Sequence, residues 1–417
     1  MLKPSTLAMI LAGGRVDELG VLTFYRPKSA VPFGGFARVI DFALSNLMRS
    51  GIELVAILSQ YHSYSLINHI GTGAAWDMIG RYRGISILPP FKGHESAEWY
   101  RGSADAVYQN LDFVQYHSPS HILILSGDHV YQMDYREMIS YHVENDADLT
   151  AAFIEVDPEQ AHRFGIGEIE FENDRGGRLV NYEEKPMHPR GNLASLTILC
   201  FKPEVLYAVL KENQQHDSFE FGRDIIPLMM EHKYEVYGYR YRGYWGYTRT
   251  IDEYWRTSMD LLGQEPRIDM EKWGLRTNME HRDIRDCQPL KAGPKANIDN
   301  SLVYNGCHIE GSVINSILFP GVRVEEGAEV RDSVLFFNNT VQGGTRIERT
   351  VSDVNTTFGP GCRIGGPRQN DKEGITVIGW NNQIPKQVRI GRSCIVYPHL
   401  SVDKWVRDIL VDGEVLL

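Results

Sequence analysis

The chain has 417 residues, of which 42% are hydrophobic and 23% are charged, and this composition excludes a disordered chain and a coiled coil. At roughly 100–200 residues per domain, the length predicts two or three domains. No apolar run approaches the roughly 18 residues that a membrane-spanning helix needs. Acidic residues outnumber basic ones by 54 to 43, for a net charge of −11, which argues against a general nucleic-acid binder.

The five cysteines are scattered, odd in number and free of any Cys-x-x-Cys pair. This pattern favours neither a disulfide framework nor a zinc site, and it predicts a cytoplasmic protein. The apolar segment Leu7–Ala12 is too short for the hydrophobic part of a secretory signal, so we interpret it as a buried first strand.

Short apolar runs alternate with helical patterns from residue 7 to about residue 262. The predicted strands are Leu7–Ala12, Leu54–Ser59, Ile85–Leu88, His121–Ser126, Leu149–Glu155 and Ser195–Phe201. This alternation predicts an α/β domain with a mostly parallel sheet, in which ligands bind beyond the carboxyl ends of the strands. The loops after Ala12 and after Ser126 are therefore the first places to look for chemistry.

One of the helical patterns runs from Ser103 to His117. Val107, Leu111 and Val114 recur at spacings of four and three and so share one face of the predicted helix. Ser103 is of a residue type that caps helix N-termini, and we predict that it does so here.

The pattern changes after about residue 290, where apolar residues recur at a step of six within each group. They are Val303, Ile309, Leu318, Val324, Val330, Leu335, Val341, Ile347, Phe358, Ile364, Ile378, Ile384, Ile390 and Val396. Such a step is typical of a parallel β-helix built from hexapeptide repeats, and it is improbable for an ordinary β-sandwich. We predict domains at 1–262 and 296–417, a linker at 263–295 and an exposed loop at Gly366–Gly374.

Paired glycines, Gly13 and Gly14, follow the first predicted strand. Glycines at this place let the backbone approach a phosphate closely, and the N–H groups that follow can donate to it. Many tight turns also use such a pair, so the motif alone leaves a simple turn equally open.

A larger set of segments resembles the ADP-glucose pyrophosphorylases, or glucose-1-phosphate adenylyltransferases, over nearly the whole chain. The matching segments are LAGG at 11–14, RPKSAVPFGG at 26–35, RVIDFALSN at 38–46, WYRGSADAVYQNL at 99–111, LSGDHVYQMDY at 125–135, EEKP at 183–186, FGRDIIP at 221–227 and TIDEYW at 250–255. The resemblance implies a nucleotidyltransferase domain of dinucleotide-binding type, with a mixed, mostly parallel sheet, followed by a left-handed parallel β-helix. It also implies a reaction in which ATP and α-glucose 1-phosphate give ADP-glucose and pyrophosphate for glycogen synthesis.

The resemblance further implies the roles of individual residues. Asp128 matches a catalytic aspartate that binds Mg²⁺, and Lys28 matches a basic residue of the signature loop. The residues implied at the nucleotide are Ala12, Gly13, Gly14, Gln60, Tyr100, Gly102, Ser103, Ala104 and Asp105, and those implied at the sugar phosphate are Gly165, Glu184, Lys185 and Ser195. Taken alone, Asp128 could be a turn cap, Lys185 a solvated surface residue and Gln60 a polar strand end.

Three departures from the family pattern touch the chemistry. Glu18 stands where the family has an arginine, Tyr247 stands where it has a second metal-binding carboxylate, and Arg223 replaces a lysine. Arg15, which we include among the candidate catalytic residues, and Arg249 are the nearby cations that could compensate. The departures leave two hypotheses: an active adenylyltransferase, or a catalytically impaired regulatory homologue that binds ligands and associates with an active subunit. An acyltransferase that uses His308 in the coils is a weaker third hypothesis.

The resemblance also bears on regulation and assembly. Family members bind metabolite effectors at the interface between the domains, where Tyr25 replaces an effector-binding lysine and Arg26 and Arg38 remain. We therefore expect a weak or absent response to fructose 1,6-bisphosphate. We also expect a homotetramer or a heteromer with a related chain, and no nucleic-acid or membrane partner.

Overall fold

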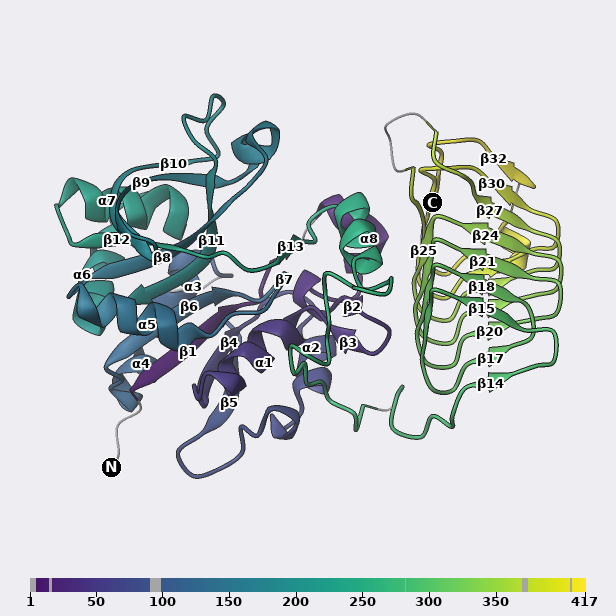
Figure 1. Cartoon of the computed structure of the whole chain (residues 1–417), viewed down its shortest axis with the longest axis horizontal. Helices are drawn as coiled ribbons and strands as arrows, with labels where there is room; N and C mark the ends of the chain where they lie inside the picture. The colour runs from purple at the N-terminus through teal and green to yellow at the C-terminus, as the bar shows by residue number, and fades with distance from the viewer. Residues whose placement is uncertain (1–4, 15–16, 91–98, 282, 370–373, 406) are drawn as a thin grey trace. The chain divides into compact units, whose positions relative to one another are not determined.

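A computed structural model describes residues 5–14, 17–90, 99–281, 283–369, 374–405 and 407–417 (Figure 1). The chain divides into two compact units, each built from segments that are not consecutive in the sequence. The sheet unit comprises Met1–Gly14, Phe42–Ser63 and Ile70–Tyr244, and the solenoid unit comprises Arg15–Asp41, Tyr64–His69 and Trp245–Leu417.

A nine-stranded mixed sheet forms the centre of the sheet unit, in the order β5-β4-β1-β6-β11-β8-β12-β10-β9. Its strands are β1 (Thr6–Leu11), β4 (Leu54–Leu58), β5 (Gly84–Leu88), β6 (His121–Ser126), β8 (Leu149–Glu155), β9 (Gly165–Asn173), β10 (Gly176–Glu184), β11 (Leu193–Phe201) and β12 (Val236–Arg240). The first four strands in that order are parallel, whereas β11 runs antiparallel to both of its neighbours β6 and β8. A further short strand, β7 (His129–Tyr131), follows β6.

Each predicted strand is present with small shifts at its ends, but the apolar-run criterion missed β9, β10 and β12. In β9, buried residues alternate with exposed acidic ones from Gly167 to Glu170. Such alternation is expected for a strand with one solvated face, and it lacks the continuous apolar run that marks a strand covered on both faces.

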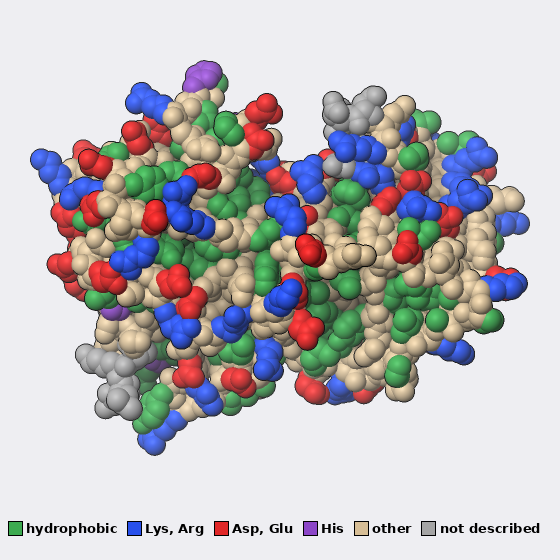
Figure 2. All heavy atoms as spheres, in the orientation of Figure 1, with side chains coloured by type: hydrophobic (Ala, Val, Ile, Leu, Met, Phe, Trp, Pro, Cys, Tyr) green, Lys and Arg blue, Asp and Glu red, His purple; other side chains and the backbone are tan. Residues whose placement is uncertain are grey.

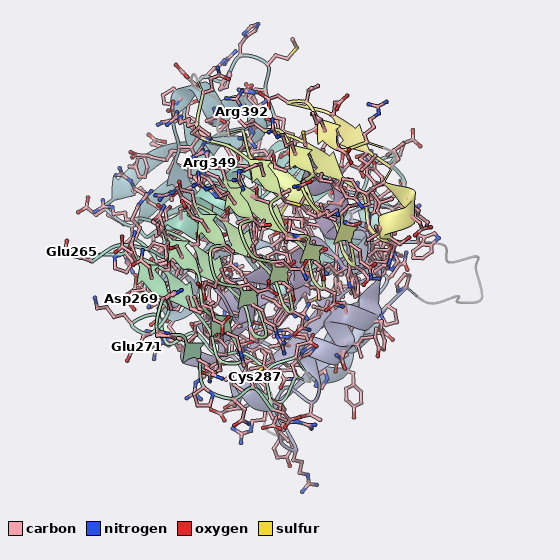
Figure 3. The ribbon with its side chains drawn as sticks, turned by 90° about the vertical axis from the view of Figure 1, so that its right-hand side faces the viewer. Glu265, Asp269, Glu271, Cys287, Arg349 and Arg392 are labelled. Carbon is pink, nitrogen blue, oxygen red and sulfur yellow. The ribbon has the colours of Figure 1, made fainter. Side chains whose placement is uncertain are left out.

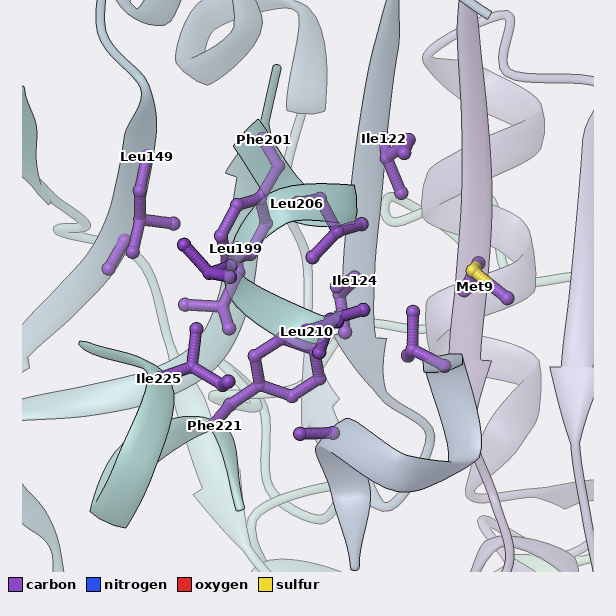
Figure 4. Packing of buried hydrophobic residues seen from close by; sticks show 14 of the residues in the cluster. Met9, Ile122, Ile124, Leu149, Leu199, Phe201, Leu206, Leu210, Phe221 and Ile225 are labelled. Atoms are coloured by element: carbon purple, nitrogen blue, oxygen red, sulfur yellow. The ribbon is translucent and has the colours of Figure 1, made fainter. Parts of the chain in front are cut away.

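Helices of the sheet unit cover the central strands. They are α3 (Ser103–Tyr108), α4 (Leu111–His117), α5 (Tyr135–Glu144), α6 (Pro203–Asn213) and α7 (Ile226–Glu231). The unit also contains the short helices η3 (Ala74–Trp76), η4 (Pro158–Arg163) and η5 (Phe221–Ile225). Figure 4 shows Leu206 and Leu210 of α6 pointing toward Ile124 and Leu199 of the sheet, in the same cluster as Phe221. Burial of these apolar side chains is the main force that holds the helices on the sheet.

The prediction that Ser103 caps a single helix from Ser103 to His117 is wrong in two respects. The helix breaks between α3 and α4, and Gly102 rather than Ser103 occupies the N-cap position. The Ser103 hydroxyl is used elsewhere: it donates to Glu220 Oε2 (2.5 Å) and accepts from Phe221 N (3.0 Å).

The solenoid unit contains three parallel sheets that wind around a common apolar core (Figure 1). The first sheet contains β14 (Lys291–Ala292), β17 (His308–Ile309), β20 (Arg323–Val324), β23 (Thr340–Val341), β26 (Thr357–Phe358) and β29 (Gln383–Ile384). The second contains β15 (Asn297–Asp299), β18 (Ser312–Ile314), β21 (Glu329–Arg331), β24 (Arg346–Glu348), β27 (Arg363–Gly365), β30 (Arg389–Ile390) and β32 (Ile409–Leu410). The third contains β16 (Leu302–Val303), β19 (Ile317–Leu318), β22 (Val334–Leu335), β25 (Thr350–Ser352), β28 (Thr376–Ile378), β31 (Ile395–Val396) and β33 (Val415–Leu416).

The six-residue step predicted which side chains fill this core. Val324 lies opposite Val341 in neighbouring coils, Val341 lies opposite Phe358, and all three are fully buried or nearly so. The hexapeptide β-helix is therefore confirmed as the architecture. Part of the predicted loop Gly366–Gly374 lies outside the described residues.

Segments from the first part of the chain complete the solenoid unit. They are η1 (Asp17–Thr23), η2 (Lys28–Ala30), β2 (Pro32–Phe33), β3 (Ala37–Arg38) and most of α2 (Ser63–Ile70), joined by β13 (Trp245–Tyr247), α8 (Ile251–Met259) and η6 (Val402–Lys404). Helix α1 (Ile40–Arg49) begins in this unit and continues into the sheet unit.

The surface of the chain carries charges of both signs. Figure 2 shows lysine and arginine side chains interspersed with acidic ones on the visible face, without a broad patch of one sign. All five cysteines are free thiols. Within the described ranges, no helix is long and apolar enough to cross a membrane.

Candidate active site

Three loops lie next to one another at the carboxyl edge of the parallel strands β1, β4 and β6. In the register of the sheet, Leu11 lies opposite both Leu58 and Ser126, so the three strands end together. Backbone hydrogen bonds extend this arrangement into the loops, from Ala12 N to Leu58 O (2.9 Å) and from Gly127 N to Leu11 O (3.0 Å). The residues after these strands are therefore brought to one edge, as the sequence predicted for the loops after Ala12 and Ser126, and Gln60 joins them from the end of β4.

Asp128 presents a partly exposed carboxylate at this edge. Its side chain is 26% exposed, Ser126 Oγ donates to Oδ1, and His129 Nε2 lies 3.4 Å from the same oxygen. Among the described residues, no group of three His, Cys, Asp or Glu side chains could hold a metal ion by itself. One carboxylate fits Mg²⁺, which prefers oxygen ligands and keeps several waters or phosphate oxygens in its shell.

Gln60 joins the end of β4 to the loop at residues 99–102. Its Oε1 accepts from Tyr100 N (2.7 Å), and its Nε2 donates to Tyr100 O (3.4 Å). The Tyr100 ring is buried, and its hydroxyl donates to Leu88 O (3.0 Å) and accepts from Asn110 Nδ2 (3.0 Å). Burial raises the pKa of Tyr100, and the nearby charge of Asp105 adds to that effect against the hydrogen bond from Asn110. Tyr100 thus anchors the loop through its side chain.

The start of α3 depends on a close backbone approach at Gly102. A Cβ added to Gly102 would lie 2.3 Å from Phe219 O, and Ala104 N donates to the same oxygen (2.8 Å). Asp105 is fully buried in the first turn and accepts from Arg101 N (3.0 Å) and Arg101 Nη2 (2.6 Å). The predicted nucleotide-binding residues of this segment therefore hold the loop in shape through contacts within the protein.

A buried phenol and a carboxylate, Tyr182 and Glu184, lie together where β9, β10 and η5 meet. Glu184 lies opposite Gly165 in the hairpin, and its Oε2 accepts from Tyr182 Oη (2.9 Å). A Cβ at Gly165 would lie 1.9 Å from Tyr182 Oη, and one at Gly222 would lie 2.3 Å from Glu184 Oε2. Burial is the main cause that raises the pKa of Tyr182, and the charge of Glu184 raises it further, so the phenol stays protonated and donates to the carboxylate.

Lys185 directly follows Glu184 in the chain. Its backbone adopts a positive φ of 48°, its N–H donates to Phe164 O (3.0 Å), and its Nζ lies 3.7 Å from Glu184 Oε1. The side chain is 48% exposed, so the ammonium group is accessible to a ligand. Ser195, in β11, hydrogen-bonds with Tyr182, which places three of the four predicted sugar-phosphate residues around that phenol and leaves Lys185 at its edge.

The signature-loop lysine belongs to the solenoid unit, where it lies near two of the three departures from the family pattern, Tyr247 and Glu18. Lys28 is buried in η2, and its Nζ lies 5.1 Å from the centre of the Tyr247 ring, within cation–π range. Arg249 donates from Nη1 to Tyr247 Oη (3.3 Å) and from Nε to Glu18 Oε1 (2.9 Å). Of the other predicted catalytic residues, Arg15 lies outside the described residues.

Contacts within the solenoid unit hold the segments that carry this cluster. Helix α8 begins two residues after Arg249 with a capping box between Thr250 and Glu253. Trp255 of the same helix donates from Nε1 to Asp332 O (2.7 Å), and Arg349 lies 4.4 Å from the centre of its ring. Figure 3 labels Arg349 on the solenoid.

Tyr25 packs into an aromatic cluster of the same unit. Its ring meets those of Trp380 and His399 edge-on, at centre distances of 5.2 Å and 5.5 Å. The Arg26 guanidinium lies 5.5 Å from the centre of the Trp380 ring. Burial, with the nearby charge of Arg26, lowers the pKa of Arg38 to about 10.

Sequence reasoning missed four residues that complete these sites: Tyr182, Gly222, Glu220 and the role of Arg249 as the partner of Glu18. Tyr182 stands two residues before Glu184 in one strand, so the period of two places both side chains on one face. That spacing could have indicated from the sequence that Tyr182 lies beside Glu184. Nothing in the spacing of Gly222 or Arg249 indicates their partners, which lie far away in the chain.

Comparisons with known proteins bear on both parts of the chain. Residues 7–264 match the Nucleotidyl transferase family, and residues 289–380 match the family described as GlmU-like, C-terminal hexapeptide. The chain is 40% identical to a glucose-1-phosphate adenylyltransferase of Desulforamulus reducens, over 94% of this chain and 98% of that protein. It is 41% identical to one of Desulfitobacterium hafniense strain Y51, over 93% and 96%, and 40% identical to one of Thermotoga maritima, over 94% and 94%.

Proposed function

The chain belongs to the glucose-1-phosphate adenylyltransferases, and we propose that it transfers the adenylyl group of ATP to α-glucose 1-phosphate. In this reaction a phosphate oxygen of the sugar attacks the α-phosphorus of ATP, the bond to the β-phosphate breaks, and pyrophosphate leaves. The observation that carries the proposal is the common edge where β1, β4 and β6 end, with Gly13, Gln60 and Asp128 directly after them. Ligands of parallel α/β sheets bind beyond such an edge.

The proposed roles follow from the groups that each loop offers. The backbone N–H groups of Gly13 and Gly14 donate to the phosphates of ATP, and Gln60 positions the loop at Tyr100 beside the base. Glu184 accepts hydrogen bonds from the hydroxyl groups of glucose, and the exposed ammonium of Lys185 neutralises the sugar phosphate. Lys28 supplies a further positive charge for the phosphates.

Asp128 would hold Mg²⁺, with water and phosphate oxygens completing the shell because Tyr247 offers no carboxylate. When bound, the ion would neutralise phosphate charge. The residues of the chain contribute to catalysis by binding both substrates and holding the attacking oxygen in line with the leaving group.

We further propose that the chain acts in the cytoplasm and assembles as a homotetramer or as a heteromer with a related chain. Among the described residues, β32 and β33 are the end strands of their sheets, and association of a second chain along such strands supports this proposal, since strand edges favour pairing. Light scattering of the purified chain at micromolar concentration tests the assembly. A mass equal to that of the monomer would contradict a homotetramer.

The test of the activity is pyrophosphate release by the purified chain with Mg²⁺, ATP and glucose 1-phosphate, and the reverse reaction with ADP-glucose. Replacing Asp128 with Asn keeps the shape and removes the charge, so the rate should fall on the order of 10² to 10⁴-fold. Replacing Asp174, an exposed carboxylate paired with Arg242, with Asn should leave the rate unchanged. A wild type with no activity on any nucleoside triphosphate would favour a regulatory homologue, and full activity of Asp128→Asn would disprove the metal assignment.

A further inference from the structure

The loop after Gly14 carries a carboxylate in a place where a nucleotide phosphate chain is expected. Like charges repel, and a free Glu18 would weaken binding of ATP. The structure gives Glu18 a partner from the other end of the nucleotidyltransferase segment: Arg249 Nε and Nη2 both lie 2.9 Å from Glu18 Oε1. The pair joins residues that are 231 positions apart in the chain.

We propose that Arg249 is the arginine that stabilises the phosphates of ATP in this chain, held beside position 18 by Glu18. This rests on the proposed function, and it names a residue for that reaction. In the family pattern an arginine at position 18 carries the charge. Here the guanidinium comes from the segment between β13 and α8 instead, and the glutamate fixes its orientation.

Three features of the cluster favour an Arg249 that binds the phosphates of ATP over an Arg249 that only neutralises Glu18. Arg249 keeps 36% of its side chain exposed, so part of the guanidinium remains accessible. Tyr247 accepts from Nη1 (3.3 Å), so the side chain is held at two points and loses little freedom when a ligand binds. Lys28 lies against the same Tyr247 ring, which brings a second cation to the cluster.

The protonation states agree with this arrangement. Partial burial raises the pKa of Glu18, but hydrogen bonds from its own backbone and from Arg249, together with the charges of Arg249 and Lys28, lower it overall. Burial lowers the pKa of Arg249, but the hydrogen bonds to Tyr247 and Glu18 raise it overall. Both groups are therefore charged at neutral pH.

The same cluster gives a physical reason why a tyrosine, and not the family's carboxylate, stands at position 247. A carboxylate at position 247 would place a second negative charge beside Arg249 and would compete with Glu18 for its N–H groups. A phenol accepts one hydrogen bond from Arg249 and packs its ring against Lys28 without adding a charge.

The test compares Arg249→Met, Glu18→Gln, the double variant, and the exchange Glu18→Arg with Arg249→Glu. Rates of pyrophosphate release are measured at varied ATP and varied glucose 1-phosphate, with thermal unfolding as a control for folding. Arg249→Met should lower kcat/KM for ATP on the order of 10²-fold and change KM for glucose 1-phosphate little. The exchange should recover most of the loss, because it returns a guanidinium to position 18. Arg178→Met is the matched control. Arg178 forms a salt bridge with Glu235 that is about as exposed as the Arg249–Glu18 pair, and its replacement should not change the rate.

The double variant decides between the two roles of Arg249. If Arg249 acts on the phosphates, Arg249→Met with Glu18→Gln stays as slow as Arg249→Met alone. If Arg249 only neutralises Glu18, Glu18→Gln removes the repulsion and restores the rate, and the proposal is overturned.

A wild type that forms no sugar nucleotide would count against the proposed function and not by itself against this inference. In that case calorimetric titration with Mg²⁺ and ATP tests the role of Arg249 through binding alone. Arg249→Met should weaken ATP binding about tenfold, whether Glu18 is present or replaced by Gln. Equal affinities for wild type and Arg249→Met would overturn the inference.

Discussion

Arg26 and Asp353 form a buried, two-pronged salt bridge between the signature loop and a coil of the solenoid. Arg26 Nη1 donates to Oδ2 (3.0 Å) and Nη2 donates to Oδ1 (2.9 Å), and the side chains are only 5% and 1% exposed. Arg26 stands two residues before Lys28, so this pair ties the segment that carries a proposed catalytic residue to the β-helix.

Breaking this pair should destabilise the solenoid unit strongly. Replacing Asp353 with Ala leaves the Arg26 guanidinium buried without its partner, at a cost of about 3–5 kcal/mol in the free energy of unfolding. Urea denaturation measures this cost. The exposed pair Lys295–Glu326 is the control, and Glu326→Ala should cost less than about 1 kcal/mol. A loss below about 1 kcal/mol for Asp353→Ala would contradict the prediction.

A second prediction concerns His142, which lies buried between α5 and β8. Burial lowers its pKa to about 4 from the ordinary 6.5, with help from the charges of His121 and Lys202, and Thr150 Oγ1 lies 2.9 Å from Nδ1. Below pH 6.5 the unfolded chain binds a proton here that the folded chain does not, so stability is present above pH 6.5 and is lost as the pH falls toward 4.

The size of this effect follows from the two pKa values. Between pH 7 and pH 5, His142 should cost the folded state about 2 kcal/mol. His142→Gln removes the titrating group, so the free energy of unfolding of this variant should fall less over the same range. Urea denaturation of both proteins at pH 7 and pH 5 measures the difference, and parallel pH profiles would show that His142 does not titrate as expected.

The glycines around Glu184 give a third prediction. A methyl group at Gly165 would overlap Tyr182 Oη and displace the Tyr182–Glu184 hydrogen bond. Gly165→Ala should therefore raise KM for glucose 1-phosphate about tenfold or more and leave KM for ATP nearly unchanged. Gly191→Ala is the matched control, because a Cβ there would have its nearest neighbour 4.0 Å away. An unchanged KM for glucose 1-phosphate would contradict the assignment of Glu184 to the sugar-binding site.

The fourth prediction concerns the effector response. Because Tyr25 packs against Trp380 and His399, and Arg26 is paired with Asp353, the segment offers little free positive charge to a sugar bisphosphate. Fructose 1,6-bisphosphate should raise the rate of the wild type less than about twofold, and an enhancement of about tenfold or more would refute this. Tyr25→Lys should increase the response, whereas Tyr82→Lys, at an exposed tyrosine, should not.

Local periodicity allowed the sequence to predict the β-helix and the site loops. A hexapeptide coil repeats the same backbone geometry, so the core positions from Ile309 to Val396 carry apolar residues at a step of six within each group. In the same way, the loops that carry Gly13 and Asp128 were singled out because each follows an apolar strand, and parallel strands end at one edge, whereas Gln60 was assigned from the family resemblance.

The tertiary structure alone decided the pairings between distant segments. Nothing in the spacing of Glu18 and Arg249, of Arg26 and Asp353, or of Glu184 and Gly222 indicates that these residues meet. Periodicity reports only which face of its own element a side chain occupies. Which element packs on that face depends on register, strand direction and chain crossing, as in β11, which runs antiparallel to both β6 and β8. The sequence therefore determined the kinds of element and the edge where chemistry occurs, and the packing of distant segments determined which charges stand together there.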